Sequence, residues 1–109
     1  MKRGEIWTVS AAGSYAAKPR PALILQDEDF SQLLSVTICP LTTDPTELPL
    51  FRIPIAPAPE NGLRQVSRVM ADKVTTVPRT KLGRKLGTLS RAELLAVDQA
   101  IVTFLGLLR

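Results

Sequence analysis

The sequence contains no histidine and a single cysteine, Cys39, among its 109 residues. Without imidazole side chains, histidine general bases, Ser-His-Asp triads and most zinc sites are excluded, and one thiol cannot supply the missing metal ligands. Any catalysis must therefore use arginine, lysine, carboxylate, hydroxyl or backbone groups, and we expect neither a metal ion nor another cofactor. A lone cysteine also forms no internal disulfide, which is typical of a protein in a reducing cytoplasm.

The sequence also lacks a long apolar run. Its longest apolar tract, at the C-terminus, is interrupted by Thr103 and Gly106 and is too short to span a membrane. The N-terminal segment MKRGEIWTV has neither the apolar centre nor the small-residue cleavage site of a signal peptide. Because 45% of the residues are hydrophobic and no segment has low complexity, we expect one soluble, cytoplasmic domain over residues 1–109, with no membrane segment.

Composition gives a divided signal for nucleic-acid binding. Residues 1–60 carry five basic and seven acidic side chains, whereas residues 61–109 carry nine basic and three acidic ones. A basic half-chain favours an anionic partner, of which nucleic acid is the commonest. It is equally typical of a protein whose surface charge serves only its solubility. Aromatic side chains are scarce, so a platform for stacking bases would have to be built around Tyr15 or Phe51.

Apolar patterns predict a protein of mainly β structure. Alternating or continuous apolar runs predict strands over residues 4–9, 21–26, 35–41, 50–56 and 66–77. The second of these is apolar throughout, which indicates burial on both faces. Pro54 places the fourth strand at an edge or a bulge, and Asn61-Gly62 indicates a hairpin turn before the fifth. The fifth has no cleanly apolar face, so we expect it to bend or to exchange its faces between the core and an interface.

The end of the sequence predicts an amphipathic helix. Pro78 favours a short helical turn, and Ser90 with Glu93 forms a capping box at the start of the helix. The expected inner face of the helix comprises Leu94, Val97, Ile101, Phe104, Leu105 and Leu108. Leu95 and Val102 widen the apolar arc beyond what one small core needs, so we expect a second contact, such as a dimer partner. Several short strands and one terminal helix indicate a small, strongly bent sheet or barrel closed by a helix.

Arg20 lies between two prolines in the segment KPRPALIL, residues 18–25. Pro21 disfavours helical backbone at Arg20, and Pro19 stiffens the approach, so the arginine is held extended at the start of a buried strand. A pre-ordered arginine loses less entropy when it binds a phosphate bidentately. The alternative is a turn arginine whose stem covers apolar surface, and the local pattern alone favours it.

Two adjacent hydroxyls, Thr42 and Thr43, follow the third predicted strand in the segment CPLTTD. Side chains are presented at a strand end, so either threonine could hold a phosphate oxygen or orient a ribose hydroxyl. A threonine-rich turn closed by Asp44-Pro45 would give the same pattern without such a role, and the pattern alone favours the turn.

The segment SRVMADKV places charged side chains on one face of the fifth predicted strand. Arg68, Met70 and Asp72 share that face, which sets a cation and a carboxylate about two strand steps apart. This arrangement suits an acid/base pair or a phosphate clamp, and it suits an ordinary cross-strand ion pair, which is more frequent. Lys73 lies nearby, and Arg79 opens a basic run that is more often a solvated surface than a binding groove.

Taken in order, these segments resemble the MazF/PemK toxin family. They are RGEIW, KPRPALIL, CPLTT and SRVMADKVTTVPRTKLG, followed by the amphipathic helix, and together they span almost the whole chain. The most specific of them are RPALIL and SRVMADKVTTV. The resemblance implies a mainly β fold with α, an SH3-like small barrel of the CcdB/PemK type with a C-terminal helix, and usually a homodimer.

The resemblance also implies an activity. Family members are toxins of toxin–antitoxin pairs that cut single-stranded RNA at short sequences without a metal ion, typically leaving a 2′,3′-cyclic phosphate and a 5′-hydroxyl. Matched by motif, the two usual catalytic residues of the family are Arg20 and Thr42. A guanidinium can stabilise charge on the pentavalent phosphorane and relay a proton, and a threonine hydroxyl can bond the scissile phosphate or position the ribose 2′-OH. The implied partners are single-stranded RNA, a cognate antitoxin and a second copy of the chain.

Further site residues follow from the same resemblance. Asp72 matches an acidic position of the family and is expected, with Arg68, to act as an acid/base pair or a clamp, although some PemK-type members carry an arginine where this chain has Met70. The expected RNA-binding residues are Ser14, Lys18, Pro21, Thr43, Lys73 and Arg79. The first loop, SAAGSYAAK, is shorter than the loop that closes over RNA in many relatives, which makes the sequence preference hard to infer and could weaken nuclease activity.

A second interpretation, from another functional class, is a non-catalytic CcdB-like barrel toxin that acts by binding a protein such as DNA gyrase. Convergence of Arg20 and Thr42 on one solvent-open cleft with basic walls would favour the nuclease, whereas side chains on unrelated surfaces would favour the binding protein. The antitoxin is expected to be a small acidic protein with a disordered tail, for which the basic second half of the chain is electrostatically suited.

Overall fold

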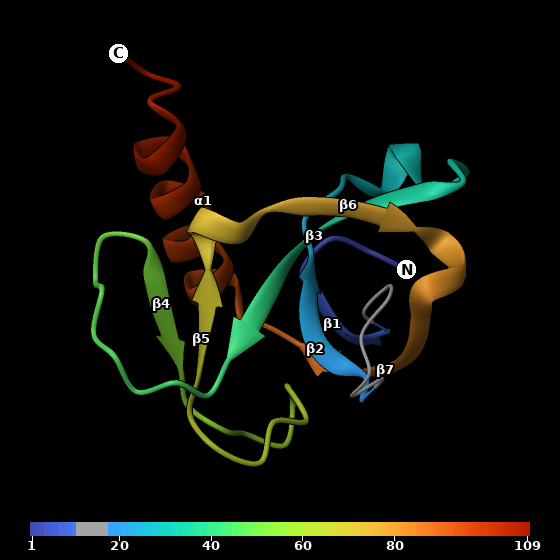
Figure 1. Ribbon diagram of the computed structural model, residues 1–109, viewed down its shortest axis with the longest axis horizontal. Helices are drawn as coiled ribbons and strands as arrows, with labels where there is room; N and C mark the ends of the chain where they lie inside the picture. The colour runs from blue at the N-terminus through green and yellow to red at the C-terminus, as the bar shows by residue number, and fades with distance from the viewer. Residues whose placement is uncertain (11–17) are drawn as a thin grey trace.

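The computed structural model describes residues 1–10 and 18–109, and in this part of the chain seven strands and one long helix make up the fold (Figure 1). The strands are β1 (Glu5–Val9), β2 (Arg20–Ile24), β3 (Ser35–Thr42), β4 (Arg52–Ile55), β5 (Ser67–Met70), β6 (Thr75–Pro78) and β7 (Leu82–Thr88). The helical elements are the 3-10 turns η1 (Glu28–Phe30), η2 (Ala71–Lys73) and η3 (Arg79–Lys81), and the helix α1 (Arg91–Leu105). The strands follow the order β4-β5-β3-β2-β1-β7, with β6 also paired to β3, and these pairs are antiparallel.

β3 joins the β4–β5 hairpin to the rest of the sheet, because it pairs with different strands along its length. Its first half pairs with β6, its middle pairs with β2, and its last two residues pair with β5. A strand that serves three neighbours bends the sheet round on itself, and the strands form the barrel-like shape seen in Figure 1. The strongly bent sheet closed by a terminal helix agrees with the architecture predicted from the sequence.

Side chains of β2 and β3 supply two hydrophobic clusters on opposite faces of these strands. The larger cluster comprises Ile6, Leu23, Cys39, Leu41, Ile55, Val69, Leu89 and Val97. The smaller cluster comprises Val9, Ala22, Ile24, Val36 and Ile38. Because successive strand residues point to opposite faces, a strand that contributes to both clusters is buried on both sides, as the continuous apolar sequence of β2 predicts.

The prediction of one continuous strand over residues 66–77 is wrong, because η2 separates β5 from β6. The break is held from outside the segment by Cys39, whose Sγ donates a hydrogen bond to the Met70 carbonyl over 3.0 Å. The bend expected from the mixed faces is present, since β5 and β6 pair with different ends of β3. One consequence is that Asp72 lies in η2 and does not continue the strand alternation of Arg68 and Met70.

The sequence pattern does not predict β7. Its residues LGRKLGT include glycine and lysine, types that are depleted in strands, so tertiary pairing with β1 overrides the local preference. A Cβ atom on Gly87 would overlap the carbonyl oxygen of Glu60, so glycine at this position lets the β4–β5 loop pack on β7. The short helical turn expected at Pro78 is present as η3.

The β4–β5 hairpin agrees with two further expectations. The Asn61-Gly62 turn lies in the loop of residues 56–66 that connects these antiparallel neighbours. Within the described residues β4 has β5 as its one strand neighbour, so Pro54 lies in an edge strand, where a missing N–H group is tolerated.

The capping box predicted for α1 is present. The Ser90 hydroxyl accepts a hydrogen bond from the Glu93 N–H over 3.1 Å, and the Glu93 carboxylate accepts one from the Ser90 N–H over 2.9 Å. On the inner face, Val97 is buried, and Leu94 and Ile101 pack against the larger cluster. The exposed apolar residues of the helix and of the segment after it are Leu95, Phe104, Leu105, Leu107 and Leu108. The C-terminal end of the helix extends away from the sheet (Figure 1), and no helix in the described residues has the length and apolar character needed to cross a membrane.

Candidate active site

Arg20, Thr42 and Arg68 occupy one row across three neighbouring strands. The β2–β3 ladder ends where Ala22 lies opposite Pro40, and the same register continued by two residues sets Arg20 opposite Thr42. On the other side of β3, Thr42 pairs directly with Arg68 of β5. Residues that lie opposite one another in antiparallel strands point to the same face of the sheet. The row therefore places Thr42 between two arginine residues, on the face of the sheet opposite the larger hydrophobic cluster.

The turn after β3 fixes the surroundings of Thr42. Its Oγ1 accepts a hydrogen bond from the Asp44 N–H over 3.1 Å, which leaves the hydroxyl hydrogen available to donate. The Asp44 carboxylate turns back on Thr46, and hydrogen bonds from the Thr46 N–H and hydroxyl hold the pKa of Asp44 below its usual value. The Arg68 Nη1 donates to the Asp44 carbonyl over 3.3 Å. The predicted threonine-rich turn is thus present, and it ties Thr42 to Arg68.

Arg20 is exposed at the start of β2. Its backbone is fixed by pairing with Val9 of β1, which confirms that the arginine is held extended before a buried strand. Lys18 and Pro19 precede it and are exposed as well. Arg20 therefore combines an ordered backbone with a solvent-facing side chain.

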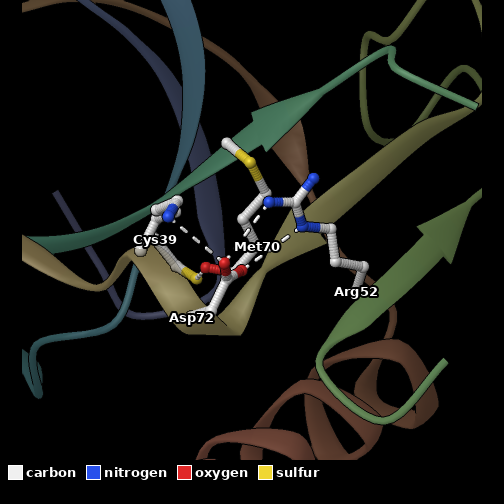
Figure 2. A network of polar contacts seen from close by, with 5 residues as sticks. Cys39, Arg52, Met70 and Asp72 are labelled. Atoms are coloured by element: carbon white, nitrogen blue, oxygen red, sulfur yellow. Dashed lines mark hydrogen bonds and ion pairs between the residues drawn. The ribbon is translucent and has the colours of Figure 1, made fainter. Parts of the chain in front are cut away.

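Asp72 pairs with Arg52 of β4, and not with Arg68 as its predicted place on a common strand face suggested. Nε and Nη2 of Arg52 donate to Oδ1 and Oδ2 of Asp72, each over 3.3 Å, and Figure 2 shows the two groups facing one another. Nζ of Lys73 lies 3.4 Å from Oδ2 of the same carboxylate. Burial raises the pKa of the Asp72 carboxyl, but hydrogen bonds and positive charge from Arg52 outweigh it and lower the pKa overall. The carboxyl is therefore ionised at neutral pH.

The single thiol offers no nucleophile. Cys39 is fully buried, and its Sγ is committed to the Met70 carbonyl. Burial, together with the negative charge of Asp72, raises the pKa of the thiol to about 12. Since the thiolate is the reactive form, the residue is inert at neutral pH. The described residues also contain no group of three or more His, Cys, Asp or Glu side chains suited to hold a metal ion.

A basic pocket of about 440 Å³, the end pocket, lies beside the row at the same end of β2 and β3. The polar and proline residues that line it include Pro21, Thr43, Arg64, Gln65, Ser67 and Arg84. Arg20 and Thr42 do not line this pocket, but the residues that follow each of them do, because neighbouring strand residues face opposite ways. Lys85 also lines it, although its ammonium is bound to Glu5 over 3.0 Å.

The remaining predicted RNA-binding residues are dispersed. Arg79 lies at the opposite end of β3, roughly 20 Å from Thr42 by strand length, and its guanidinium is committed to the carbonyls of Ser31 and Leu33. Lys73 is exposed beside Asp72 in η2. Ser14 lies outside the described residues.

Neither of the two candidate residues for base stacking forms a stacking surface within the described residues. Tyr15 lies outside the described residues. The Phe51 ring packs on Phe104 of α1 with ring centroids 5.8 Å apart, so it serves the contact between sheet and helix.

Sequence reasoning missed Arg52, the arginine that pairs with Asp72, and the basic residues of the end pocket. Arg52 is twenty residues from Asp72, and no local pattern links the two. Arg64 and Gln65 had one usable signal, because they come two and three residues after the Asn61-Gly62 turn and a turn presents the residues near it at a sheet end.

Comparison with known proteins gives consistent matches over almost the whole chain. A family model described as "PemK-like, MazF-like toxin of type II toxin-antitoxin system" matches residues 2–105. The chain is 49% identical over 107 residues to a probable endoribonuclease MazF of Mycolicibacterium smegmatis, and the match covers 98% of both chains. The solved Mycobacterium tuberculosis toxin MazF-mt6 is 32% identical with a TM-score of 0.79, covering 94% of this chain and 96% of that one.

A second solved structure, an endoribonuclease in complex with its cognate antitoxin from a mycobacterial species, is 25% identical with a TM-score of 0.78. That match covers 98% of this chain and 96% of the other. These neighbours share the barrel-like sheet with one C-terminal helix, so the fold class predicted from the sequence is confirmed.

Proposed function

This chain belongs to the PemK-like, MazF-like toxins of type II toxin–antitoxin systems, and from that membership we propose that it is an endoribonuclease that cuts single-stranded RNA without a metal ion. The carrying observation is the row in which Thr42 lies between Arg20 and Arg68. The relative that is 49% identical is named as a probable endoribonuclease, which supports the same activity here. The relatives described above bear MazF or endoribonuclease names, and they lend no support to the gyrase-binding alternative.

The proposed reaction is attack of a ribose 2′-OH on the adjacent phosphorus. The new O2′–P bond forms as the P–O5′ bond breaks, so the 2′-OH loses a proton, the departing 5′ oxygen gains one, and the products are a 2′,3′-cyclic phosphate and a 5′-hydroxyl. Arg20 and Arg68 stabilise the negative charge that develops on the non-bridging oxygens. Arg20 relays the proton, because its guanidinium gives one proton to the departing 5′ oxygen and takes up the one that the 2′-OH releases. The Thr42 hydroxyl donates to a phosphate oxygen and fixes the phosphorus in the row.

We assign Asp72 the role of a clamp in this site. Its carboxyl is ionised at neutral pH, so it is a hydrogen-bond acceptor and cannot serve as a general acid there. It fixes Arg52, which together with Arg68 lines a small cleft of about 240 Å³ under the loop that follows β3. Glu47 lines the same cleft, and its carboxylate and that of Asp72 offset the two guanidinium groups, so the clamp positions Arg52 beside Arg68 without adding net positive charge. Lys73, held by the same carboxylate, adds a further cation for the RNA backbone.

The predicted RNA contacts are assigned to four places. Lys18 extends the positive charge at the start of β2, and Pro21 and Thr43 contact RNA in the end pocket. Ser14 is proposed to contact RNA from the first loop. Arg79 lies at the other end of β3. It is proposed to contact an RNA strand that runs the length of the molecule, or one that is bound at the site of a second copy of the chain.

Two protein partners complete the proposal. A second copy of the chain covers the exposed apolar residues at the end of α1, so the protein is a homodimer. An antitoxin inhibits it, as the solved complex of a similar endoribonuclease with its cognate antitoxin suggests. Its place is the cytoplasm, where its RNA substrates lie and where the lone Cys39 stays reduced.

Cleavage of a long single-stranded RNA in EDTA tests both the proposed activity and the catalytic roles of Arg20 and Thr42. We expect wild-type protein to cut the RNA, and Arg20→Ala or Thr42→Ala to lower the rate by about 100-fold. Arg91→Ala removes an exposed arginine of α1 and serves as the matched control, with an unchanged rate. Intact RNA with the wild-type protein overturns the proposed function, whereas full activity of Arg20→Ala overturns only the residue assignment. A 2′-deoxy nucleotide on the 5′ side of the cut bond must block cleavage if the 2′-OH is the nucleophile.

A further inference from the structure

We propose that the end pocket binds one nucleotide beside the scissile phosphate and that Gln65 determines which base is accepted there. This inference rests on the proposed nuclease function and extends it from cleavage to base selection. Its first support is position, because Pro21 and Thr43 line the pocket and directly follow the two proposed catalytic residues, Arg20 and Thr42. The row and the pocket share one end of β2 and β3 but lie on opposite faces of these strands, so a nucleotide next to a phosphate in the row reaches the pocket around the strand ends.

The chemistry of the pocket fits a nucleotide. Its volume of about 440 Å³ lies in the ordinary range for small-molecule sites. Arg64 and Arg84 contribute guanidinium groups, and none of the described residues that line the pocket carries a carboxylate to repel a phosphate. Leu63 and Leu86 add apolar surface beside them for the face of a base. The Gln65 amide offers both a donor and an acceptor, as base discrimination in RNA requires.

The loop that carries Arg64 and Gln65 is ordered by the buried side chain of Asn61, which is 2% exposed. Its Oδ1 accepts hydrogen bonds from the N–H groups of Ala58, over 3.1 Å, and Leu63, over 2.9 Å. Its Nδ2 donates to the Ala56 carbonyl over 2.9 Å. One side chain thus ties together the backbone of residues 56–63, directly before Arg64 and Gln65.

The loop is also locked onto β7. The Thr88 N–H donates to the Glu60 carbonyl over 2.8 Å, and Gly62 adopts a φ of +69° against the Leu86 carbonyl. A Cβ atom on Gly62 would overlap that carbonyl oxygen, so the two backbones are in direct contact. Figure 1 shows the loop, in yellow-green, below the end of β3. A loop whose backbone is fixed in this way presents Gln65 at a lower ordering cost on binding, which favours selective recognition.

Sequencing the ends of fragments cut from a randomised single-stranded RNA tests the assignment. We expect wild-type protein to prefer one base at a position flanking the cut, and Gln65→Ala to reduce that preference about tenfold or more. Preferences at the other positions should stay unchanged. Gln32→Ala, which alters an exposed glutamine outside the pocket, should keep the wild-type profile. A wild-type protein that cuts RNA, with the same profile in Gln65→Ala, overturns the inference and leaves the nuclease function standing.

Titration of AMP, CMP, GMP and UMP into the protein, followed by NMR, gives an answer that does not depend on cleavage. We expect the amide signals of Thr43, Gln65 and Arg84 to shift, with one base bound at least a few fold more tightly than the others. Gln65→Ala should remove the difference between bases. Equal shifts for the four nucleotides, or no shifts at these residues, overturn the inference. This result does not depend on cleavage, so a protein that binds one base selectively but cuts no RNA overturns only the nuclease function.

Discussion

Arg52 holds Asp72 through two hydrogen bonds of 3.3 Å, one to each carboxylate oxygen. Both side chains are largely buried, with exposed fractions of 15% and 12%. The pair joins the edge strand β4 to η2, the turn at which the chain leaves β5 for β6. It therefore fixes the bend of the sheet and holds Arg52 in the cleft that it shares with Arg68.

Asp72→Asn should lower the free energy of unfolding by about 1–3 kcal/mol. The substitution removes the charge that compensates the largely buried Arg52 guanidinium, and a cation left without its partner in such a site is costly. Thermal unfolding measures the effect. Asp98→Asn is the matched control, because its pair with Arg3 is more exposed and should contribute less than about 1 kcal/mol.

The pH dependence of cleavage separates a clamp from an acid/base residue. If Asp72 is a clamp, Asp72→Asn lowers the rate but leaves the shape of the pH–rate profile unchanged. Loss of one limb of the profile would show that Asp72 itself exchanges a proton during the reaction and would contradict the clamp assignment.

The elements that sequence alone predicted are those set by local chemistry. β1 to β4 follow apolar runs, and α1 begins at a capping box that needs only Ser90 and Glu93. The strands over residues 66–77 and β7 were not correctly predicted because distant groups decide them. A thiol on β3 holds the break before η2, and pairing with β1 makes a strand of a sequence rich in glycine and basic residues.

The same division applies to the candidate site. Arg20 is marked by two prolines and Thr42 by a hydroxyl pair, and both signals are local. Their relation is not local, since it depends on the register in which Ala22 lies opposite Pro40. The partner of Asp72 could not be inferred either, because the break at η2 rotates the carboxylate away from Arg68 and toward Arg52.

Stability should fall in acid because of Glu5. Burial alone would raise the pKa of this carboxyl, but hydrogen bonds from the Trp7 indole, the Lys2 N–H and the Lys85 ammonium outweigh it and lower the pKa to about 2, from an ordinary 4.5. A folded-state pKa below the unfolded one stabilises the fold above pH 4.5, by about 3 kcal/mol, and this contribution is lost as the pH falls toward 2.

Denaturant unfolding at pH 7, 4 and 2.5 measures the contribution of Glu5. Glu5→Gln should be less stable than wild type at pH 7, and the difference should shrink as the pH falls. Glu28→Gln, at an exposed position in η1, is the control and should follow the wild type throughout. A difference between Glu5→Gln and wild type that is constant with pH would mean that the charge of Glu5 contributes nothing.

Cys39 should react with a thiol reagent only when the protein unfolds. The side chain has no exposed surface, and its pKa of about 12 leaves almost no thiolate at neutral pH. We expect 5,5′-dithiobis(2-nitrobenzoate) to modify the native protein at least about 1,000-fold more slowly than the protein in guanidinium chloride, because the population of the open form sets the rate. Rapid modification of the native chain would contradict the burial of β3 described above.

Gly62→Ala and Gly106→Ala make a matched pair that tests whether the β4–β5 loop is locked onto β7. The two glycines have nearly the same φ, +69° and +68°, so an alanine meets the same backbone strain at either site, about 1–2 kcal/mol. Their surroundings differ, because a Cβ on Gly62 would overlap the Leu86 carbonyl oxygen, whereas one on Gly106 has Arg109 Cδ, at 3.8 Å, as its nearest neighbour. Gly106→Ala should therefore cost only the backbone strain, and Gly62→Ala about 3 kcal/mol or more, measured by denaturant unfolding. Equal costs would mean that the loop yields to the added methyl group, and a loop that yields cannot hold Gln65 in one place.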